Sequence, residues 1–343
     1  MNIGEIIIIS VIKILIIVVV MLLTVSYLVY FERRISAWIQ NRLGPNRVGW
    51  QGVLQPFADV FKLLLKEDIV PEYANRTIHA LAPMIALFVA FSTYAVIPFG
   101  PDVNLFGYSI QLVVADVDMG ILFVLALTSI GVYALTLAGW SSGSKYSLLG
   151  GIRSSAQMIS YEVSMGFSVA GVLLLAGSLR PIAIVEAQSG WMWNAILQPI
   201  GFITFLVSAF AETNRLPFDL PEAEPELVGG FHTEYSSMKF AGFFLAEYAN
   251  MIIAGAMIVT LYLGGWQIPY IEKLGLPGGL VAVLQVGAFI FKVAALLFFF
   301  LWVRWTLPRF RYDQLMSLGW KVMFPLSLVN LVWVALLIMI FGL

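Results

Sequence analysis

The sequence predicts an all-α polytopic membrane protein, and three observations support this prediction. Of the 343 residues, 60% are hydrophobic and only 11% are charged, with a mean hydropathy of +0.92. A soluble domain carries about 25% charged residues and cannot bury this much apolar surface in one core. Apolar runs long enough to cross about 30 Å of hydrocarbon recur along the chain. The composition therefore argues against a soluble enzyme.

We expect a single transmembrane domain over residues 1–343, with about eight membrane-spanning helices. The first run, at about 6–30, is too long for the apolar core of a signal peptide, and no small-residue cleavage site follows it. The other seven are expected at about 77–98, 119–140, 155–177, 192–211, 239–263, 281–303 and 320–341.

The basic residues predict the orientation of these helices. Of the 19 lysines and arginines, 15 lie in loops that follow odd-numbered spans, whereas Arg180 and Lys273 lie on the opposite side. Cytoplasmic loops carry an excess of Lys and Arg, so both termini are expected on the non-cytoplasmic side. The net charge of −1 provides no basic field that would attract nucleic acid.

Between the first two spans, residues 52–67 have the pattern of an amphipathic helix. Apolar side chains recur at a spacing of three to four residues, and Pro56 falls in the first turn, where proline is tolerated. This helix is expected to lie along the inner membrane surface or to pack beneath the bundle. Its apolar residues are Val53, Leu54, Phe57, Val60, Phe61, Leu64 and Leu65; its polar residues are Gln55, Asp59, Lys62 and Lys66.

Three ionisable residues, Glu162, Glu247 and Lys292, lie well inside apolar runs. An exposed carboxylate at such a depth would cost several kcal/mol, so these groups are expected to face a polar cavity. One interpretation is a proton relay, and the alternative is a structural ion pair or hydrogen bond between helices.

The segment 212–238 is predicted to be an acidic loop. Prolines recur at every fourth position, at 217, 221 and 225, which precludes a continuous helix. Acids outnumber bases here, and carboxylates crowded together titrate collectively, which suits coupled proton movement. Arg215, three residues after Glu212, is expected to hold part of this acidic group ionised. The alternative is a solvated loop that binds a basic partner.

Other residue classes restrict the chemistry that the chain can perform. There is no cysteine, so there is no thiolate zinc site and no cysteine-ligated iron-sulfur cluster. The two histidines, His79 and His232, lack metal-site spacing, and no glycine pattern binds a nucleotide. Any redox centre must therefore belong to a partner. The arginines after the first span, Arg33, Arg34, Arg42 and Arg47, either set topology or pair with carboxylates.

Three long motifs resemble one known family, and the similarity covers nearly the whole chain. The first consists of ERRI at 32–35, QNRLGPNRVG at 40–49 and LQPFAD at 54–59, followed by Lys62. The second is AETNRLPFDL at 211–220 with ELV at 226–228 and Glu234-Tyr235, and the third is PRFRYDQ at 308–314. In this order they closely resemble a membrane component of proton-pumping NADH:quinone oxidoreductase, respiratory complex I. This component is called the H subunit in bacteria and subunit 1 in mitochondria.

The resemblance implies a subunit that joins the membrane and peripheral arms, encloses the quinone tunnel and links quinone reduction to proton translocation. It implies tunnel residues Arg33, Gln40, Arg42, Phe244 and Arg304. It implies a polar path of Asp59, Glu162, Glu212, Asp219, Glu222, Glu224, Glu226, Glu234 and Glu247, with supporting ion pairs from Glu32, Arg215, Arg309 and Arg311.

The same resemblance implies that the chain holds no metal and no cofactor of its own. Quinone, ubiquinone or menaquinone, is then the substrate, and FMN and iron-sulfur clusters are expected in partner subunits. The expected partners are the peripheral-arm quinone-site subunits, neighbouring small and antiporter-like membrane subunits and the lipid bilayer. The expected location is the bacterial cytoplasmic (inner) membrane.

Two other classes of function remain open on the residues alone. A stand-alone proton- or sodium-coupled transporter also contains buried acids, although we detect no internal repeat of the kind that many such folds show. A passive anchor for a soluble redox module would explain the basic loops but leaves the buried ionisable residues without a role. Within the family, relatives serve membrane-bound hydrogenases and plastoquinone- or F420-linked complexes.

Overall fold

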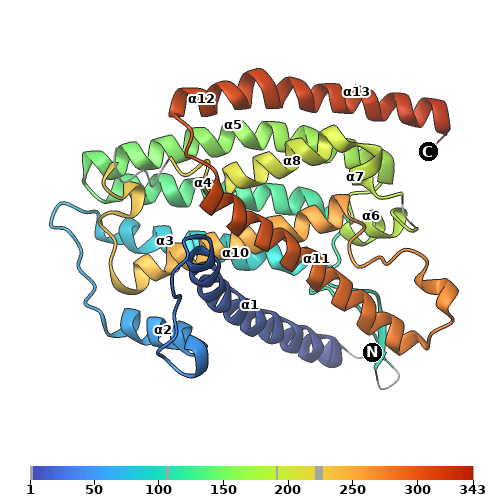
Figure 1. The fold of residues 1–343 in the computed structure, drawn as a ribbon, viewed down its shortest axis with the longest axis horizontal. Coiled ribbons are helices and arrows are strands. Elements are labelled where there is room, and N and C mark those ends of the chain that lie inside the picture. The colour runs from blue at the N-terminus through green and yellow to red at the C-terminus, as the bar shows by residue number, and fades with distance from the viewer. Residues whose placement is uncertain (1–2, 106–107, 191, 221–226, 343) are drawn as a thin grey trace.

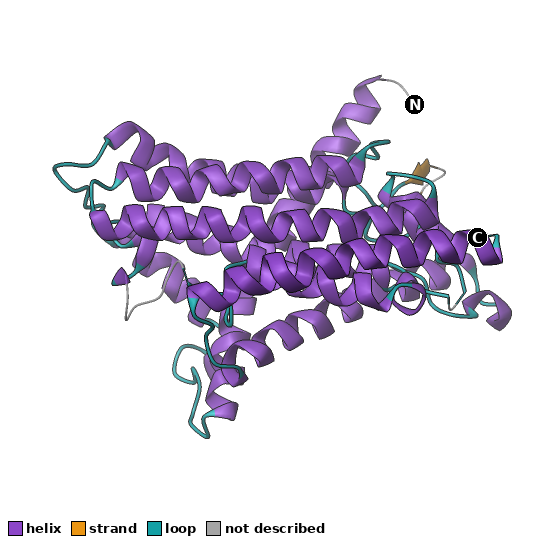
Figure 2. Ribbon diagram, turned by 90° about the horizontal axis from the view of Figure 1, so that it is seen from above, coloured by secondary structure: helices purple, strands orange, loops and turns teal. Residues whose placement is uncertain are grey.

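The computed structural model describes residues 3–105, 108–190, 192–220 and 227–342, which form a bundle of long helices (Figure 1). The predicted all-α class is confirmed. The helices are α1 Ile3–Ile39, α2 Gln55–Leu65, α3 Arg76–Thr93, α4 Gly120–Ser141, α5 Lys145–Ala176, α6 Pro181–Ala187, α7 Asn194–Leu197, α8 Pro199–Glu212, α10 Ser237–Tyr262, α11 Gly278–Thr306, α12 Tyr312–Leu318 and α13 Phe324–Phe341. One antiparallel hairpin, β1 Val103–Leu105 and β2 Tyr108–Ile110, lies at the end of the bundle that holds both chain ends (Figure 2).

Seven helical segments among the described residues are long and apolar enough to cross a membrane: 8–39, 76–96, 120–141, 145–176, 237–262, 278–306 and 312–341. The span expected at 192–211 is instead divided at Gln198 into the one-turn α7 and the 14-residue α8. At 1.5 Å per residue α8 rises only about 21 Å. The two ends of the chain lie at the same end of the bundle (Figures 1 and 2).

Two helices extend beyond their predicted bounds on the basic side. α1 continues to Ile39 instead of ending near 30, because Glu32, Arg33 and Arg34 are good helix formers and no Gly or Pro interrupts them. α5 begins at Lys145 instead of 155, although it contains Gly150. A Cβ on Gly150 would lie 2.7 Å from the Phe231 backbone nitrogen, so the bare glycine permits this close contact.

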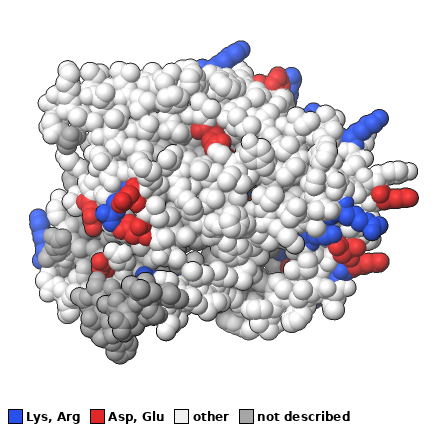
Figure 3. Space-filling model, turned by 180° about the vertical axis from the view of Figure 1, so that it is seen from behind, with Lys and Arg blue, Asp and Glu red and all other residues white. Residues whose placement is uncertain are grey.

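α10 lies in the interior of the bundle and α1 lies at its edge. In the most apolar 18-residue windows, 72% of α10 is buried against 11% of α1. α10 packs against α3 and α11, while α5 packs against α4, α8 and α13. On the face that Figure 3 shows, most charged side chains gather toward the two ends, and the band between them carries little charge apart from one acidic group. This distribution suits a bundle whose sides face lipid.

The predicted amphipathic helix is observed as α2. It lies at one end of α1 and packs against both α1 and α10. Pro56 is buried in its first turn, as predicted, whereas the apolar side chains of Phe61 and Leu65 remain exposed. One face of α2 therefore packs against α1 and α10. Another face leaves apolar side chains exposed at the surface.

Asn330 of α13 secures the N-terminus of α8 inside the bundle. Its Oδ1 accepts a hydrogen bond from the Gly201 backbone nitrogen at 2.9 Å, and its Nδ2 donates to Gln198 Oε1 at 3.1 Å. The Asn330 side chain is fully buried. Since the first four N–H groups of a helix lack partners within it, Asn330 satisfies one of these donors where water is excluded.

Lys292 of α11 has a comparable role at the C-terminal end of α10. Its Nζ donates to the backbone carbonyls of Leu263 at 2.8 Å, Gly265 at 3.0 Å and Gln267 at 2.8 Å, and it lies 4.3 Å from the centre of the Trp193 ring. A cation at a helix C-terminus compensates the unpaired carbonyls and the helix dipole. These contacts favour the structural interpretation of Lys292 over the relay.

Replacing Asn330 with Leu should lower the free energy of unfolding by about 1–3 kcal/mol, because a buried N–H group loses its acceptor. Thermal unfolding of the detergent-solubilised protein measures the effect. Val332→Leu, at a position of the same helix that is 62% exposed, serves as the control and should leave the transition unchanged. If the Asn330→Leu protein unfolds at the same temperature as the wild type, the hydrogen bond between Gly201 and Asn330 contributes nothing to stability.

Candidate functional site

A buried ion cluster joins four elements near the basic end of the bundle. Arg215, in the turn after α8, lies with its Nη1 3.3 Å from Glu32 Oε2 of α1 and with its Nε 2.6 Å from Glu247 Oε1 of α10. Tyr248 donates its hydroxyl to Glu32 Oε2 at 2.7 Å, and its ring lies 4.2 Å from the Arg215 guanidinium carbon. Arg304 of α11 donates to Glu32 Oε1. We refer to these five residues as the Arg215 cluster.

The Arg215 cluster contains two carboxylates and two guanidinium groups, so its charges balance. Arg215 is 3% exposed and Glu32 is 5% exposed. Burial disfavours the charge on Arg215, but Glu247, Tyr248 and Glu32 raise its pKa above the ordinary value. Because an unpaired buried charge costs several kcal/mol, each member of the cluster depends on the others.

Gln157 of α5 holds the turn that carries Arg215. Its buried Nε2 donates to the backbone carbonyls of Ala211 and Phe218, each at 2.8 Å, and to Asn214 Oδ1 at 3.2 Å. One of these acceptors, the Ala211 carbonyl in the last turn of α8, also accepts from the Asn214 backbone nitrogen at 3.4 Å. The chain turns here with Asn214 at a φ of +49°, a conformation that asparagine tolerates better than most residues. Gln157 therefore fixes the direction in which Arg215 leaves the helix.

A first cavity, the α2 cavity, has a volume of about 300 Å³ and lies among α1, α2 and α10. Most of its lining is apolar, while Arg33, Asp59 and Lys62 supply charge. Arg33 Nη1 donates to Asp59 Oδ2 at 2.7 Å, and Gln55 donates to Asp59 Oδ1 at 3.0 Å. The other lining residues are Val25, Ser26, Val29, Tyr30, Gln55, Pro56, Val60, Leu63, Phe240, Ala241, Phe244, Leu245 and Tyr248.

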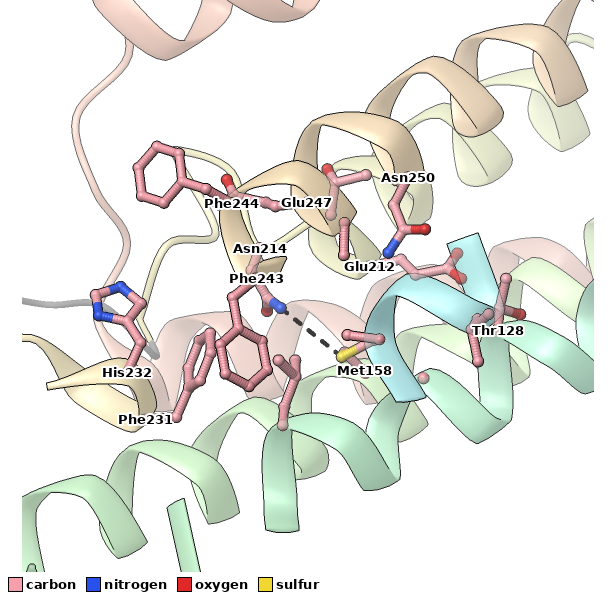
Figure 4. Close-up of a pocket in the computed structure, with 16 residues that line it drawn as sticks. Thr128, Met158, Glu212, Asn214, Phe231, His232, Phe243, Phe244, Glu247 and Asn250 are labelled. Atoms are coloured by element: carbon pink, nitrogen blue, oxygen red, sulfur yellow. Dashed lines mark hydrogen bonds between the residues drawn. The ribbon is translucent and has the colours of Figure 1, made fainter. Parts of the chain in front are cut away.

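A second cavity, the glutamate cavity, has a volume of about 50 Å³ and contains both Glu212 and Glu247 in its lining (Figure 4). Phe244 lines both this cavity and the α2 cavity. A third cavity of about 40 Å³ also has Glu212 in its lining. The glutamate cavity and the third cavity share Thr128, Glu212, Thr213 and Asn250. The three cavities therefore form a series in which the first pair shares one lining residue and the second pair shares four.

Glu162, on α5, is a third carboxylate beside this series. The hydroxyl of Ser129 donates to Glu162 Oε1, and Glu162 lies near enough to Glu212 for their charges to interact. The structure thus brings together Glu247, Glu212 and Glu162, which come from α10, α8 and α5 respectively.

Other expected site residues lie outside this series. Asp219 pairs with Arg309 at 2.9 Å, and Arg311 pairs with Asp313 at 3.0 Å on the surface. Gln40 and Arg42 bond to each other at 2.7 Å at the exposed end of α1 and line none of the three cavities. Glu234 offers its backbone oxygen to His79 Nε2 at 3.4 Å, and its side chain is half-buried. Glu222, Glu224 and Glu226 lie outside the described residues.

Among the described residues, Arg215 contacts carboxylates from outside its own segment. Its spacing from Glu212 suggested that it would act on the acids of its own segment, but it faces Glu32 of α1 and Glu247 of α10. The reason is the turn held by Gln157, which directs the side chain away from the α8 axis. A spacing rule for helices does not hold across such a turn.

Sequence reasoning missed Gln157, Tyr248, Thr128 and Asn250. Asn250 could have been found, because it follows Glu247 by three residues and therefore shares its helix face. Thr128 and Gln157 carry no comparable signal, since their partners lie on other elements. Across the described residues, no group of three or more His, Cys, Asp or Glu side chains could hold a metal ion.

The fold and site define a multi-pass membrane protein with buried carboxylates beside internal cavities. Residues 12–335 match the family model described as NADH dehydrogenase. The chain is 57% identical to NADH-quinone oxidoreductase subunit 8 of Rhodothermus marinus, covering 94% of this chain and 95% of that protein. It is 54% identical to the H subunit of NADH-quinone oxidoreductase from Salinibacter ruber, covering 94% of each.

The chain therefore belongs to the family of the membrane-embedded H subunits of NADH-quinone oxidoreductase, respiratory complex I, as its motifs predicted. It is a subunit of an oxidoreductase complex, and its partners are other subunits of that complex.

Replacing Glu32 with Ala should lower the free energy of unfolding by about 3–5 kcal/mol, because it removes one partner of a buried ion pair. Asp313→Asn is the matched control. It breaks an ion pair whose side chains are 76% and 65% exposed, and it should cost less than about 1 kcal/mol. Chemical or thermal unfolding in detergent compares the two variants. Equal losses of unfolding free energy in the two variants would contradict the view that the members of the buried cluster depend on one another.

Proposed function

We propose that this chain forms the membrane wall of a quinone passage and transmits the effect of quinone reduction to carboxylates that move protons. The observation that supports this most directly is the series of three cavities. It begins at the mostly apolar α2 cavity, passes Phe244 and reaches Glu247 and Glu212.

The α2 cavity suits the substrate class. An isoprenoid quinone has an apolar tail and a polar head group, so its passage needs apolar walls and a few polar groups. Val25, Val29 and Leu245 supply apolar surface, and Arg33 and Lys62 supply donors. Ligand pockets commonly have volumes of about 300–1,000 Å³. Gln40, Arg42 and Arg304 would support the passage in the assembled complex.

Reduction of a quinone to a quinol takes up two electrons and two protons. The electrons would come from iron-sulfur clusters and FMN held by peripheral-arm subunits. The charge that develops on the head group would act on the Arg215 cluster, where Glu247 borders the glutamate cavity. Glu247, Glu212 and Glu162 would then pass a proton from the quinone cavity into the membrane, toward antiporter-like subunits.

The remaining expected acids would form the part of the path nearest the quinone. They are Asp59, Asp219, Glu222, Glu224, Glu226 and Glu234, and Arg309 and Arg311 would hold local ion pairs. The chain would lie in a bacterial cytoplasmic membrane with both termini on the non-cytoplasmic side. This orientation follows from the positive-inside rule.

A stand-alone transporter is less well supported than this function. The relatives are named as subunits of a quinone oxidoreductase, and no internal repeat is detected in the sequence. A passive anchor would give no reason for carboxylates to line two adjoining internal cavities.

Replacing Glu212 or Glu247 with Gln should slow coupled NADH:quinone reduction about tenfold or more, because an amide cannot accept and release the proton. NADH oxidation by an artificial acceptor at the peripheral arm should be unchanged. Glu186→Gln, at an exposed position on α6, is the control and should behave as wild type. Full quinone reductase activity with intact proton stoichiometry in both variants would reject the relay.

Replacing Ala241 with Trp should obstruct the α2 cavity, since Ala241 lines it. We expect quinone reduction to fall about tenfold, with a larger loss for long-tailed than for short-tailed quinones. The control is Met238→Trp on the same helix, at a position that is 49% exposed. Unchanged kinetics with long-tailed quinones would show that the substrate does not use this cavity.

A further inference from the structure

We propose that Asn250 is a positioning residue that orients the water through which a proton passes between Glu247 and Glu212. This inference rests on the proposed proton path and assigns a role within it to a residue that cannot itself be ionised. It follows from where Asn250 lies, from the size of the cavity and from the partners of the two carboxylates.

Asn250 lines the same cavity as the two carboxylates. It follows Glu247 by three residues on α10, so both side chains occupy one helix face. It lines the glutamate cavity together with Glu247 and Glu212, and it lines the third cavity together with Glu212. Its amide is directed toward Glu212 (Figure 4).

The glutamate cavity has room for a water molecule. Its volume of about 50 Å³ exceeds the 10–15 Å³ that a single water requires by this measure. A buried water also needs two to four polar partners. Glu212, Glu247 and Asn250 provide three, whereas Val89, Leu135 and Phe243 make other parts of the wall apolar.

The two carboxylates are already held from other directions. Glu247 Oε1 is 2.6 Å from Arg215 Nε, and the side chain of Thr128 lies close enough to Glu212 to interact with its carboxylate. Among the described neutral side chains that both cavities share, Asn250 is the only amide and offers two N–H donors and one acceptor, whereas Thr128 and Thr213 each carry one hydroxyl. An amide can therefore accept from or donate to an intervening water while the proton moves between the carboxylates.

Two variants that are isosteric with each other test this role in the assembled complex. Asn250→Val removes every polar atom of the side chain, and Asn250→Thr has the same shape as Val but keeps one hydroxyl. We expect the Val variant to lose about tenfold in coupled NADH:quinone reduction and to show a larger solvent deuterium isotope effect. The Thr variant should stay within about threefold of the wild type. Asn250→Leu, the closest apolar match to Asn in shape, replaces Val if the Val complex does not assemble.

Thr260→Val on the same helix is the matched control. Thr260 is buried and donates its hydroxyl to the Ala256 carbonyl of its own helix, so the variant should leave activity and isotope effect unchanged. NADH oxidation by an artificial acceptor verifies assembly in every variant.

Glu212→Gln, measured in parallel, separates the two proposals. If it impairs coupled activity while Asn250→Val retains the wild-type rate, proton stoichiometry and isotope effect, the role of Asn250 is refuted and the path stands. If Glu212→Gln itself has no effect, the proposed path fails. Equal losses in the Val and Thr variants with an unchanged isotope effect would also refute the positioning role, because they indicate only a packing requirement.

Discussion

The structure depends on one buried cation, Arg215, and on the carboxylates that compensate it. A guanidinium group that is 3% exposed is stable only when it is paired. Glu32 from α1 and Glu247 from α10 provide this pairing, and Arg304 from α11 balances the second carboxylate. The cluster therefore fixes three long helices and the turn after α8 relative to one another. It also sets the position of Glu247 at the edge of the glutamate cavity.

This arrangement explains why an ion cluster and a set of cavities occur together. Tyr248 belongs to the Arg215 cluster and lines the α2 cavity, while Glu247 belongs to the cluster and lines the glutamate cavity. In the proposed function, a change of charge in the α2 cavity would act on Tyr248, which is next to Glu247 of the proton path. Two adjacent residues on α10 connect the two spaces, and Lys292 and the packing of α11 hold that helix in place.

The sequence predicted the helical class, the long spans and the amphipathic α2, since apolar runs and their spacing reflect local constraints. The span predicted at 192–211 missed the break at Gln198, although Pro199, the first residue of α8, is a local signal for it. The bonds from Asn330 of α13 to this N-terminus come from far along the chain and carry no such signal. The motifs identified Glu32 and Arg215 as ion-pair residues without identifying their partners. The partners lie on separate helices, and only the packing of α1 against α10 and the turn after α8 brings them together.

The most direct test is a high-resolution cryo-EM map of the assembled complex with a quinone analogue bound. We expect the analogue in a passage that includes the α2 cavity, Glu32 and Glu247 within ion-pair distance of Arg215, and ordered waters on both sides of Glu212. Dry cavities around Glu212, or Glu247 directed into lipid with no passage open to the bilayer, would contradict the central claim.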